Sequence, residues 1–235
     1  WAEYMVTKAG MCVPLSKNIS LDQASMMFVN PMTALAFFDI YKKLPNPTKK
    51  HRGIINTAGA SALGRMVIKF GQKQGIPVIS VVRREEQVEI LKADGAEYIV
   101  DSSDPNFETN LKKLAHQLNA TVIFDAVGGE MVQMLLDAAP KGSNLFIYGR
   151  LSADACEISP GDLIFTGNQI RGFWLTCWLH SKSFLQSIMN TRKIQSLLGK
   201  ELGTTIHQKF SIEQISEALE IYQNNMSKGK VLIQF

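Results

Sequence analysis

The residues from Thr57 to Gly64, TAGASALG, have the composition of a turn that could hold a phosphate group. Small side chains there permit a tight bend, a close approach of the backbone to a pyrophosphate, and close packing of helix on sheet. Ala58, Ser61 and Gly64 have the spacing of the glycines in GxxGxxG, with alanine and serine replacing the first two. We expect a helix to start near Ala62, with its free N–H groups and positive dipole end facing the ligand. Plain packing of a strand-to-helix turn is the alternative.

Two arginines, Arg83 and Arg84, follow the next apolar run, VISVV. Proteins that bind NAD usually place an acidic residue here, where it accepts a hydrogen bond from the ribose 2′-hydroxyl. A guanidinium can instead bind a 2′-phosphate through two hydrogen bonds. The pair therefore favours NADPH over NADH. In the alternative interpretation, the arginines are part of a solvated helix start and pair with Glu85 and Glu86.

Two more segments, DAVGG (125–129) and YGRLS (148–152), end apolar runs further along the chain. Ligands of open α/β sheets bind at the carboxyl ends of strands, so both segments would face the same crevice. Gly128 and Gly129 would let the backbone approach a cofactor. An ordinary glycine turn explains them equally well.

The secondary-structure elements that position these residues can be predicted from the alternation of apolar and amphipathic segments after Gly53. Apolar runs of about five residues alternate with amphipathic stretches of about 10–15, which indicates βαβ units with right-handed crossovers. We therefore predict a Rossmann-type α/β fold with a doubly wound parallel sheet. The predicted strands are 53–58, 77–82, 96–101, 121–126, 144–149 and 169–175.

The flanking segments predict further elements. Residues 1–15 are expected to form one or two short strands. Ser20 can cap a helix, with Gln23 placed as in a capping box. Asn30-Pro31 interrupts the helical pattern, so two helical pieces should meet there, the second running from about Thr33 to Leu44. The remaining predictions are helices over 181–199 and 212–225 and a last strand in GKVLIQF, 229–235.

Composition excludes several classes of protein. The chain has 235 residues, of which 46% are apolar and 20% charged, so it should fold as a globule with a sizeable core. The net charge of +4 is small and no basic stripe occurs, which disfavours nucleic acid as a partner. No apolar run reaches about 18 residues, so we expect no membrane span. We also predict no metal site, because the histidines are scattered and the cysteines lack zinc-ligand spacing. The cysteines are Cys12, Cys156 and Cys177.

Several short motifs follow one another along the chain in a characteristic order. They are WAEY, VPL, NPMTA, TAGASALG, LKADGAEYIVD, FDAVGG, FIYGRLS, IRGFWLTCW and GKVLIQF. This order resembles the medium-chain dehydrogenase/reductase superfamily, and most of all its zinc-free branch of quinone reductases and 2-enoyl-thioester reductases. The ASALGRM loop and the FWL triplet point to the mitochondrial-type enoyl thioester reductases.

The resemblance implies a role for each matching residue. Thr33 would lie beside the nicotinamide, Arg83 and possibly Arg84 would clamp the 2′-phosphate, and Tyr148 and Gly149 would flank the nicotinamide ribose. The pyrophosphate loop would comprise Ala58, Ser61, Ala62, Leu63 and Gly64, and a strand with Phe173, Trp174 and Leu175 would lie along the nicotinamide. Core packing is the alternative reading of that triplet.

The chain also departs from the family pattern. Family members begin with a GroES-like barrel, and almost all of it is missing here. The resemblance implies that residues 1–30 and 200–235 are a remnant of this catalytic domain and that 31–199 form the NADP-binding domain. In enoyl thioester reductases the catalytic tyrosine comes from the missing part, so no residue here is assigned as proton donor.

Two functional hypotheses follow. In the first, the chain is the cofactor-binding portion of an NADPH-dependent oxidoreductase that reduces a 2-enoyl thioester or a quinone. In the second, it is a catalytically degenerate structural subunit of a larger assembly, possibly mitochondrial. The resemblance implies an intracellular setting, either mitochondrial matrix or bacterial cytoplasm. It also implies a homodimer formed by edge pairing of the last strand of the sheet, over 173–178, or a place in a larger complex.

Overall fold

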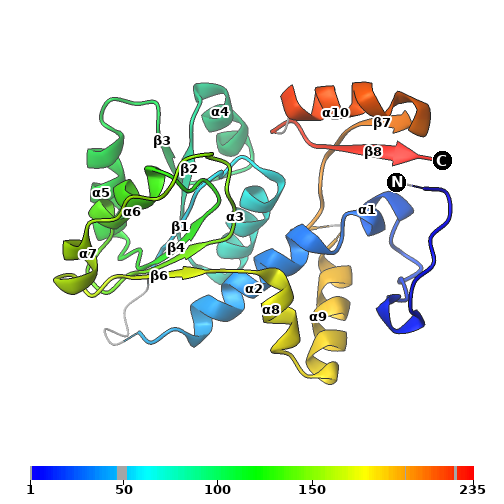
Figure 1. Cartoon of the computed structure of the whole chain (residues 1–235), viewed down its shortest axis with the longest axis horizontal. Helices are drawn as coiled ribbons and strands as arrows, with labels where there is room; N and C mark the ends of the chain where they lie inside the picture. The colour runs from blue at the N-terminus through cyan, green and yellow to red at the C-terminus, as the bar shows by residue number, and fades with distance from the viewer. Residues whose placement is uncertain (1, 47–51, 199, 225–226) are drawn as a thin grey trace.

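The computed structural model describes residues 2–46, 52–198, 200–224 and 227–235. Its main feature is a six-stranded sheet in the order β3-β2-β1-β4-β5-β6, in which all neighbouring strands are parallel (Figure 1). This order reverses between β1 and β4, as in the Rossmann fold, and confirms the predicted fold class. The strands are β1 (Ile54–Asn56), β2 (Val78–Val82), β3 (Tyr98–Asp101), β4 (Val122–Asp125), β5 (Asn144–Ile147) and β6 (Gln169–Gly172).

Helices cover both faces of this sheet because alternate residues of the central strands point to opposite sides. Ile54 and Phe124 pack on one side, and Ile55 and Ile123 on the other. The first side is covered by α2 (Val29–Lys43), α3 (Ala62–Gln74) and α4 (Glu85–Ala93), and the second by α5 (Phe107–Gln117) and α6 (Met131–Ala138).

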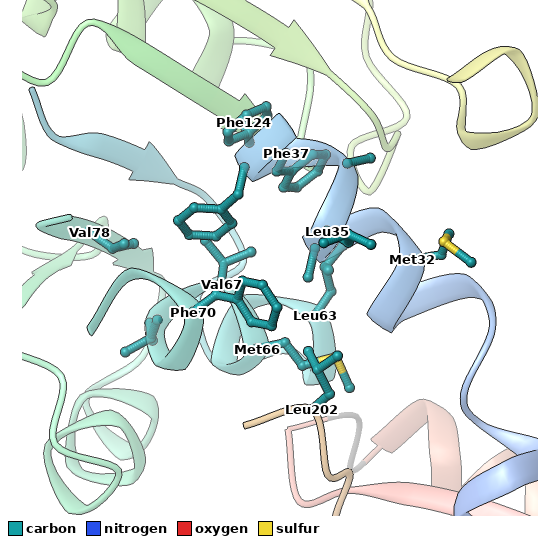
Figure 2. Close-up of a cluster of buried hydrophobic side chains, with 14 of the residues drawn as sticks. Met32, Leu35, Phe37, Leu63, Met66, Val67, Phe70, Val78, Phe124 and Leu202 are labelled. Atoms are coloured by element: carbon teal, nitrogen blue, oxygen red, sulfur yellow. The ribbon is translucent and has the colours of Figure 1, made fainter. Parts of the chain in front are cut away.

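The first of these two cores joins the helix before the sheet to its central strands (Figure 2). The Phe37 ring of α2 stacks on Phe124 of β4, with ring centroids 3.9 Å apart. Met66 and Phe70 of α3 and Leu202 belong to the same cluster. Burial of such aromatic and aliphatic side chains contributes roughly 1.5–3 kcal/mol each, so α2 is held firmly against the sheet.

The remaining elements lie outside this sheet. Strands β7 and β8 form a separate two-stranded parallel sheet, with α10 in the connection between them. The bounds are η1 (Ala9–Met11), α1 (Leu21–Ser25), α7 (Pro160–Ile164), α8 (Leu175–His180), α9 (Phe184–Leu197), β7 (Ile206–Ser211), η2 (Ile212–Gln214), α10 (Ile215–Asn224) and β8 (Lys230–Gln234). Among the described helices, none combines the length and the apolar character needed to cross a membrane.

Two predictions for the amino-terminal region are wrong. Described residues 2–15 contain no strand, only the turn η1, and Tyr4, Met5 and Val6 are exposed. A strand needs a neighbouring strand for its backbone groups, and here none is paired with this segment. The helical break lies at 26–28, before the predicted one, because Pro31 occupies the first turn of α2, where a missing N–H costs nothing.

The cap of α1 is as predicted, since the Ser20 side chain accepts a hydrogen bond from the backbone N–H of Gln23. The Gln23 side chain does not complete a capping box. It donates to the carbonyl oxygen of Thr204 (3.1 Å) and accepts from the Thr204 N–H (3.3 Å) instead. Gln23 thereby joins α1 to the chain segment that leads into β7.

The predicted strands 169–175 and 173–178 need a correction. The last strand of the sheet ends at Gly172, after which the Phe173 N–H donates to the carbonyl oxygen of Ile147 (2.8 Å). The chain then turns into helix α8, whose Trp178 is buried and donates through Nε1 to Asp39 on α2 (3.0 Å). An apolar aromatic run is compatible with a strand or a buried helix, and the docking of α8 on α2 selects the helix.

Asp39 holds α8 on α2. Besides Trp178, its Oδ2 atom accepts hydrogen bonds from the ammonium groups of Lys182 (2.6 Å) and Lys43 (3.0 Å). Partial burial favours the neutral carboxyl, but the hydrogen bonds from Lys182, Lys43 and Trp178 outweigh it and lower the pKa of Asp39 below its usual value. The carboxylate is therefore the ionised form in the folded protein near neutral pH.

Candidate functional site

The turn between β1 and α3 has the geometry of an anion-binding turn. Ala58 has a φ of 51°, in the left-handed region that favours glycine, at the first position of the predicted pattern. Ser61 is the N-cap of α3, and its hydroxyl accepts a hydrogen bond from the Gly64 N–H (3.0 Å). Within the described chain, the N–H groups of Ala62 and Leu63 donate to no protein acceptor. Two backbone donors at a helix start are thus free for an anion.

Two glycines let this turn pack closely. A Cβ atom on Gly64 would lie 2.3 Å from the carbonyl oxygen of Gly59 and 2.7 Å from that of Ala58. A Cβ on Gly59 would lie 2.8 Å from the Cβ of Ser80 on β2. Gly64 was predicted from the spacing, whereas Gly59 was missed because it falls between the spaced positions.

A buried carboxylate ties this turn to the turn after β4. Asp125 accepts hydrogen bonds from the Thr57 hydroxyl (2.6 Å) and from the N–H groups of Val127 (3.0 Å) and Gly128 (2.8 Å). The Thr57 hydroxyl in turn accepts from the Ala126 N–H (2.8 Å). Sequence reasoning missed this pair. The only signal was an acidic residue at the end of an apolar strand.

The turns after β4 and β5 also lie against each other. Gly128 and Gly129 have φ values of 74° and 57°, which an L side chain rarely adopts. A Cβ on Gly129 would lie 2.7 Å from the Ser152 hydroxyl, and one on Gly149 would lie 2.7 Å from the carbonyl oxygen of Ala126. The glycines therefore serve close packing between turns that meet at the carboxyl ends of the strands.

The two arginines after β2 are exposed and carry free guanidinium groups. Arg84 is the N-cap residue of α4, and the Arg83 backbone N–H donates to the Gln87 side chain (3.1 Å). In the described part of the chain, neither guanidinium forms an ion pair, so the alternative pairing with Glu85 and Glu86 does not occur.

Tyr148 lies after β5 against the core. Its ring packs edge-on against Phe37, with centroids 4.9 Å apart, and its covered hydroxyl has no hydrogen-bond partner among the described residues. Burial, and secondarily the charge of Asp125, raise the pKa of Tyr148 far above its usual value. The hydroxyl is therefore neutral, and its proton has no acceptor among the described residues. Thr33, one helical turn before Phe37, is also buried.

The predicted FWL triplet is not a single functional strand. The Phe173 ring packs edge-on against Phe37 at a centroid distance of 5.2 Å, as expected for core packing. Trp174 is 67% exposed, and Leu175 is half-buried at the start of α8. The roles of these three residues toward a nicotinamide stay predictions. Among the residues described, no group of three or more His, Cys, Asp and Glu side chains is placed to hold a metal ion.

The fold and the free donors at its strand ends are those of a nucleotide-binding α/β domain. Residues 62–191, more than half of the chain, match the family model of the zinc-binding dehydrogenases. The chain belongs to this family, and with it to the medium-chain dehydrogenase/reductase superfamily.

Its relatives are enoyl and quinone reductases. The chain is 28% identical over 184 residues to the mitochondrial enoyl-[acyl-carrier-protein] reductase of Arabidopsis thaliana, covering 76% of this chain and 48% of that protein. A solved structure from Mesorhizobium loti, named as a candidate NADPH:quinone reductase, is 31% identical with a TM-score of 0.83, covering 97% of this chain and 64% of that one. An enoyl thioester reductase from Candida tropicalis, a mutant form, shares the fold at 22% identity and a TM-score of 0.75, covering 92% of this chain and 62% of that one. The chain thus spans about half the length of the curated relative from Arabidopsis.

Proposed function

We propose that this chain binds NADPH and is the cofactor-binding portion of a zinc-independent reductase. Its substrate would be a 2-enoyl thioester, reduced at the conjugated C=C bond, or a quinone. One observation carries the proposal: Arg83 and Arg84, whose guanidinium groups form no ion pair with a described residue, follow β2, where an NAD-binding protein usually has an acidic residue. A guanidinium there attracts a 2′-phosphate, whereas a carboxylate would repel it.

The residues present fit a dinucleotide. The free N–H groups of Ala62 and Leu63 would bind the pyrophosphate, and Gly64 keeps α3 close enough for them to reach it. The Tyr148 hydroxyl, with no protein partner among the described residues, would donate to a polar group near the nicotinamide ribose. Thr33 is proposed to lie beside the nicotinamide.

When bound, NADPH supplies a hydride for the β-carbon of an enoyl thioester, and a proton is then added at the α-carbon. No residue of this chain is assigned as the proton donor. Tyr148 is a poor choice, because its raised pKa makes it a weaker acid than an ordinary tyrosine. The chain's own contribution would be to bind and orient the cofactor, which provides much of an enzyme's advantage.

We propose that residues 1–30 and 200–235 form one unit, a remnant of the catalytic domain, beside the nucleotide-binding domain of 31–199. The two ends are joined by side-chain contacts. Gln23 makes two hydrogen bonds to the backbone of Thr204, and Lys209 forms an ion pair with Asp22 (2.6 Å). These contacts support a single unit built from both chain ends.

The second candidate function is a catalytically degenerate subunit of a larger assembly. It is favoured by Ala58, which takes a left-handed backbone conformation without being glycine, a strain of roughly 1–3 kcal/mol. Nucleotide binding separates the two candidates.

The proposal also includes a cellular compartment and an oligomeric state. The Arabidopsis relative is named as mitochondrial, and the Mesorhizobium neighbour is bacterial, so we propose the mitochondrial matrix or a bacterial cytoplasm. We also propose a homodimer formed along β6, which is an outer strand of the sheet and has one unpaired edge. Such edges are templates for strand pairing.

The test is a titration of NADPH and of NADH into the chain and into Arg83→Ala. Lys113→Ala, which removes an exposed cation from α5, is the matched control. We expect micromolar binding of NADPH, clearly tighter than that of NADH. Loss of a charge-assisted contact worth roughly 1.5–3 kcal/mol should weaken NADPH binding about 10- to 100-fold in Arg83→Ala and not in the control. If neither nucleotide binds the parent chain, the enzyme proposal is overturned in favour of the degenerate subunit.

A further inference from the structure

A second concave region lies away from the strand ends. It is a cavity of about 730 Å³ between residues 16–23, which precede α2, and residues 192–200 of α9 and its carboxyl end. The cavity shares no lining residue with the turns after β1, β2, β4 and β5. Its volume is within the range of about 300–1,000 Å³ that is typical of small-molecule sites.

The walls of this cavity are fixed to each other by side chains. The Gln195 side chain of α9 accepts a hydrogen bond from the Ser16 N–H (2.8 Å) and donates to the carbonyl oxygen of Pro14 (2.9 Å). On the other wall, Gln23 is bonded to Thr204 through both ends of its amide. The space is therefore held open by folded structure and needs little rearrangement to admit a ligand.

The electrostatic character of the lining is positive. Arg192 and Lys200 are its charged residues, and it includes no acidic one. Neither cation forms an ion pair with any described residue. The hydroxyl groups of Ser16 and Ser20 and the amide of Asn18 line the same space and can donate hydrogen bonds.

Charged groups of both signs surround the cavity: Glu201, the neighbour of Lys200, pairs with Lys73 (2.6 Å), and Asp22 pairs with Lys209 (2.6 Å). Lys193, the next residue on α9, has a pKa lowered first by burial and then by the nearby ammonium groups of Lys42 and Lys73. Asp39 opposes this effect only in part. The Glu201 and Asp22 carboxylates are already paired with other lysines, whereas Arg192 and Lys200 form an ion pair with no described residue and can attract an anion into the cavity.

We propose that this cavity binds a small organic polyanion, a compact molecule that carries two or more carboxylate or phosphate groups. Two cations at one cavity favour more than one oxyanion group, and the volume exceeds what a single inorganic ion would fill. The hydroxyl and amide donors would take the remaining oxygen atoms of the ligand. The site is independent of the proposed nucleotide site.

The experiment uses citrate as a polycarboxylate probe, glucose 6-phosphate as a phosphate-ester probe and glucose as the neutral control. Each is titrated calorimetrically into the chain at constant ionic strength in the presence of saturating NADPH. We expect saturable binding of at least one anionic probe and none of glucose. The double variant Arg192→Ala/Lys200→Ala should weaken binding at least about 10-fold, because two charged contacts are lost. Which probe binds identifies the oxyanion.

Matched variants keep the outcome specific. Lys113→Ala removes an exposed cation from α5 and should leave the affinity for the probe unchanged. Ser196→Trp fills the cavity while retaining both cations and should abolish binding. The proposal is overturned if neither anion binds the parent chain, or if the double variant binds as tightly as Lys113→Ala does. It is equally overturned if Ser196→Trp, shown to be folded by circular dichroism, binds the probe unchanged.

Discussion

Substitution of Gly64 by alanine tests whether the packing of α3 on its turn positions the anion-binding N–H groups. The added Cβ would lie 2.3 Å from a backbone oxygen, whereas ordinary carbon–oxygen contacts begin at about 3.3 Å, so the turn and the helix must separate by about 1 Å. Overpacking of this kind costs roughly 1–3 kcal/mol, and alanine recovers about 0.5–1 kcal/mol of helix preference. The net expectation is a loss of about 1–2 kcal/mol of folding stability.

The displacement should also affect nucleotide binding. Ala62 and Leu63 offer their N–H groups to the pyrophosphate only while α3 abuts the turn. Loss of one or two hydrogen bonds to a charged group corresponds to roughly 10- to 100-fold weaker binding. The assay combines urea unfolding, followed by circular dichroism, with a fluorescence titration of NADPH on the same preparations.

Gly71→Ala is the matched control on the same helix. A Cβ there would lie 2.5 Å from the Val78 side chain and 2.8 Å from the carbonyl oxygen of Ile76, at the end of α3 remote from the turn. It should lower stability to a similar extent while leaving NADPH affinity unchanged. The reasoning is refuted if Gly64→Ala retains full affinity, or if both variants lose affinity in proportion to their stability.

Two further predictions concern buried and partly buried carboxylates. Thr57→Val removes a donor to Asp125 and an acceptor for the Ala126 N–H, so urea unfolding should show a loss of about 2–4 kcal/mol; a loss below about 0.5 kcal/mol would contradict this account. For Asp39, whose pKa is lowered in the folded state, the stabilising contribution is present above the usual carboxyl pKa of about 4 and disappears as pH falls through the lower folded-state pKa. Thermal unfolding across pH 2–7 should therefore show Asp39→Asn less stable than the parent at neutral pH and the gap closing in acid; a pH-independent gap would exclude this mechanism.

The middle of the sheet was predictable because β1, β2 and β4 are buried along their whole length and therefore appear as continuous apolar runs between turns. The ends of the chain were not. The apolar residues 4–6 indicate a strand. A strand is stable only when it pairs with another strand, and the local sequence does not reveal which strand, if any, is the partner. The segment 173–178 was assigned to a strand for a related reason, since the hydrogen bond from Trp178 to Asp39 joins residues far apart in the chain.

The residues of the candidate site were also only partly predictable from the sequence. Ser61, Ala62 and Gly64 were predictable because their roles depend on spacing within one turn. The contact between Thr57 and Asp125 was not, because the two residues lie 68 positions apart and meet only when β1 and β4 become neighbours in the sheet. Local pattern thus located the turn between β1 and α3, and topology supplied the contact between this turn and the end of β4.

The unit β7–α10–β8 affects the order in which parts of the chain unfold. It is contiguous in sequence, and a two-stranded sheet has too little buried surface to be stable alone. Segments of this kind open as cooperative units at a lower free energy than the core. The carboxyl-terminal unit can therefore detach while the six-stranded sheet stays folded. The lifetime of the chain in the presence of proteases would then be governed by this opening, and a partner covering the unit would lengthen it without altering the core.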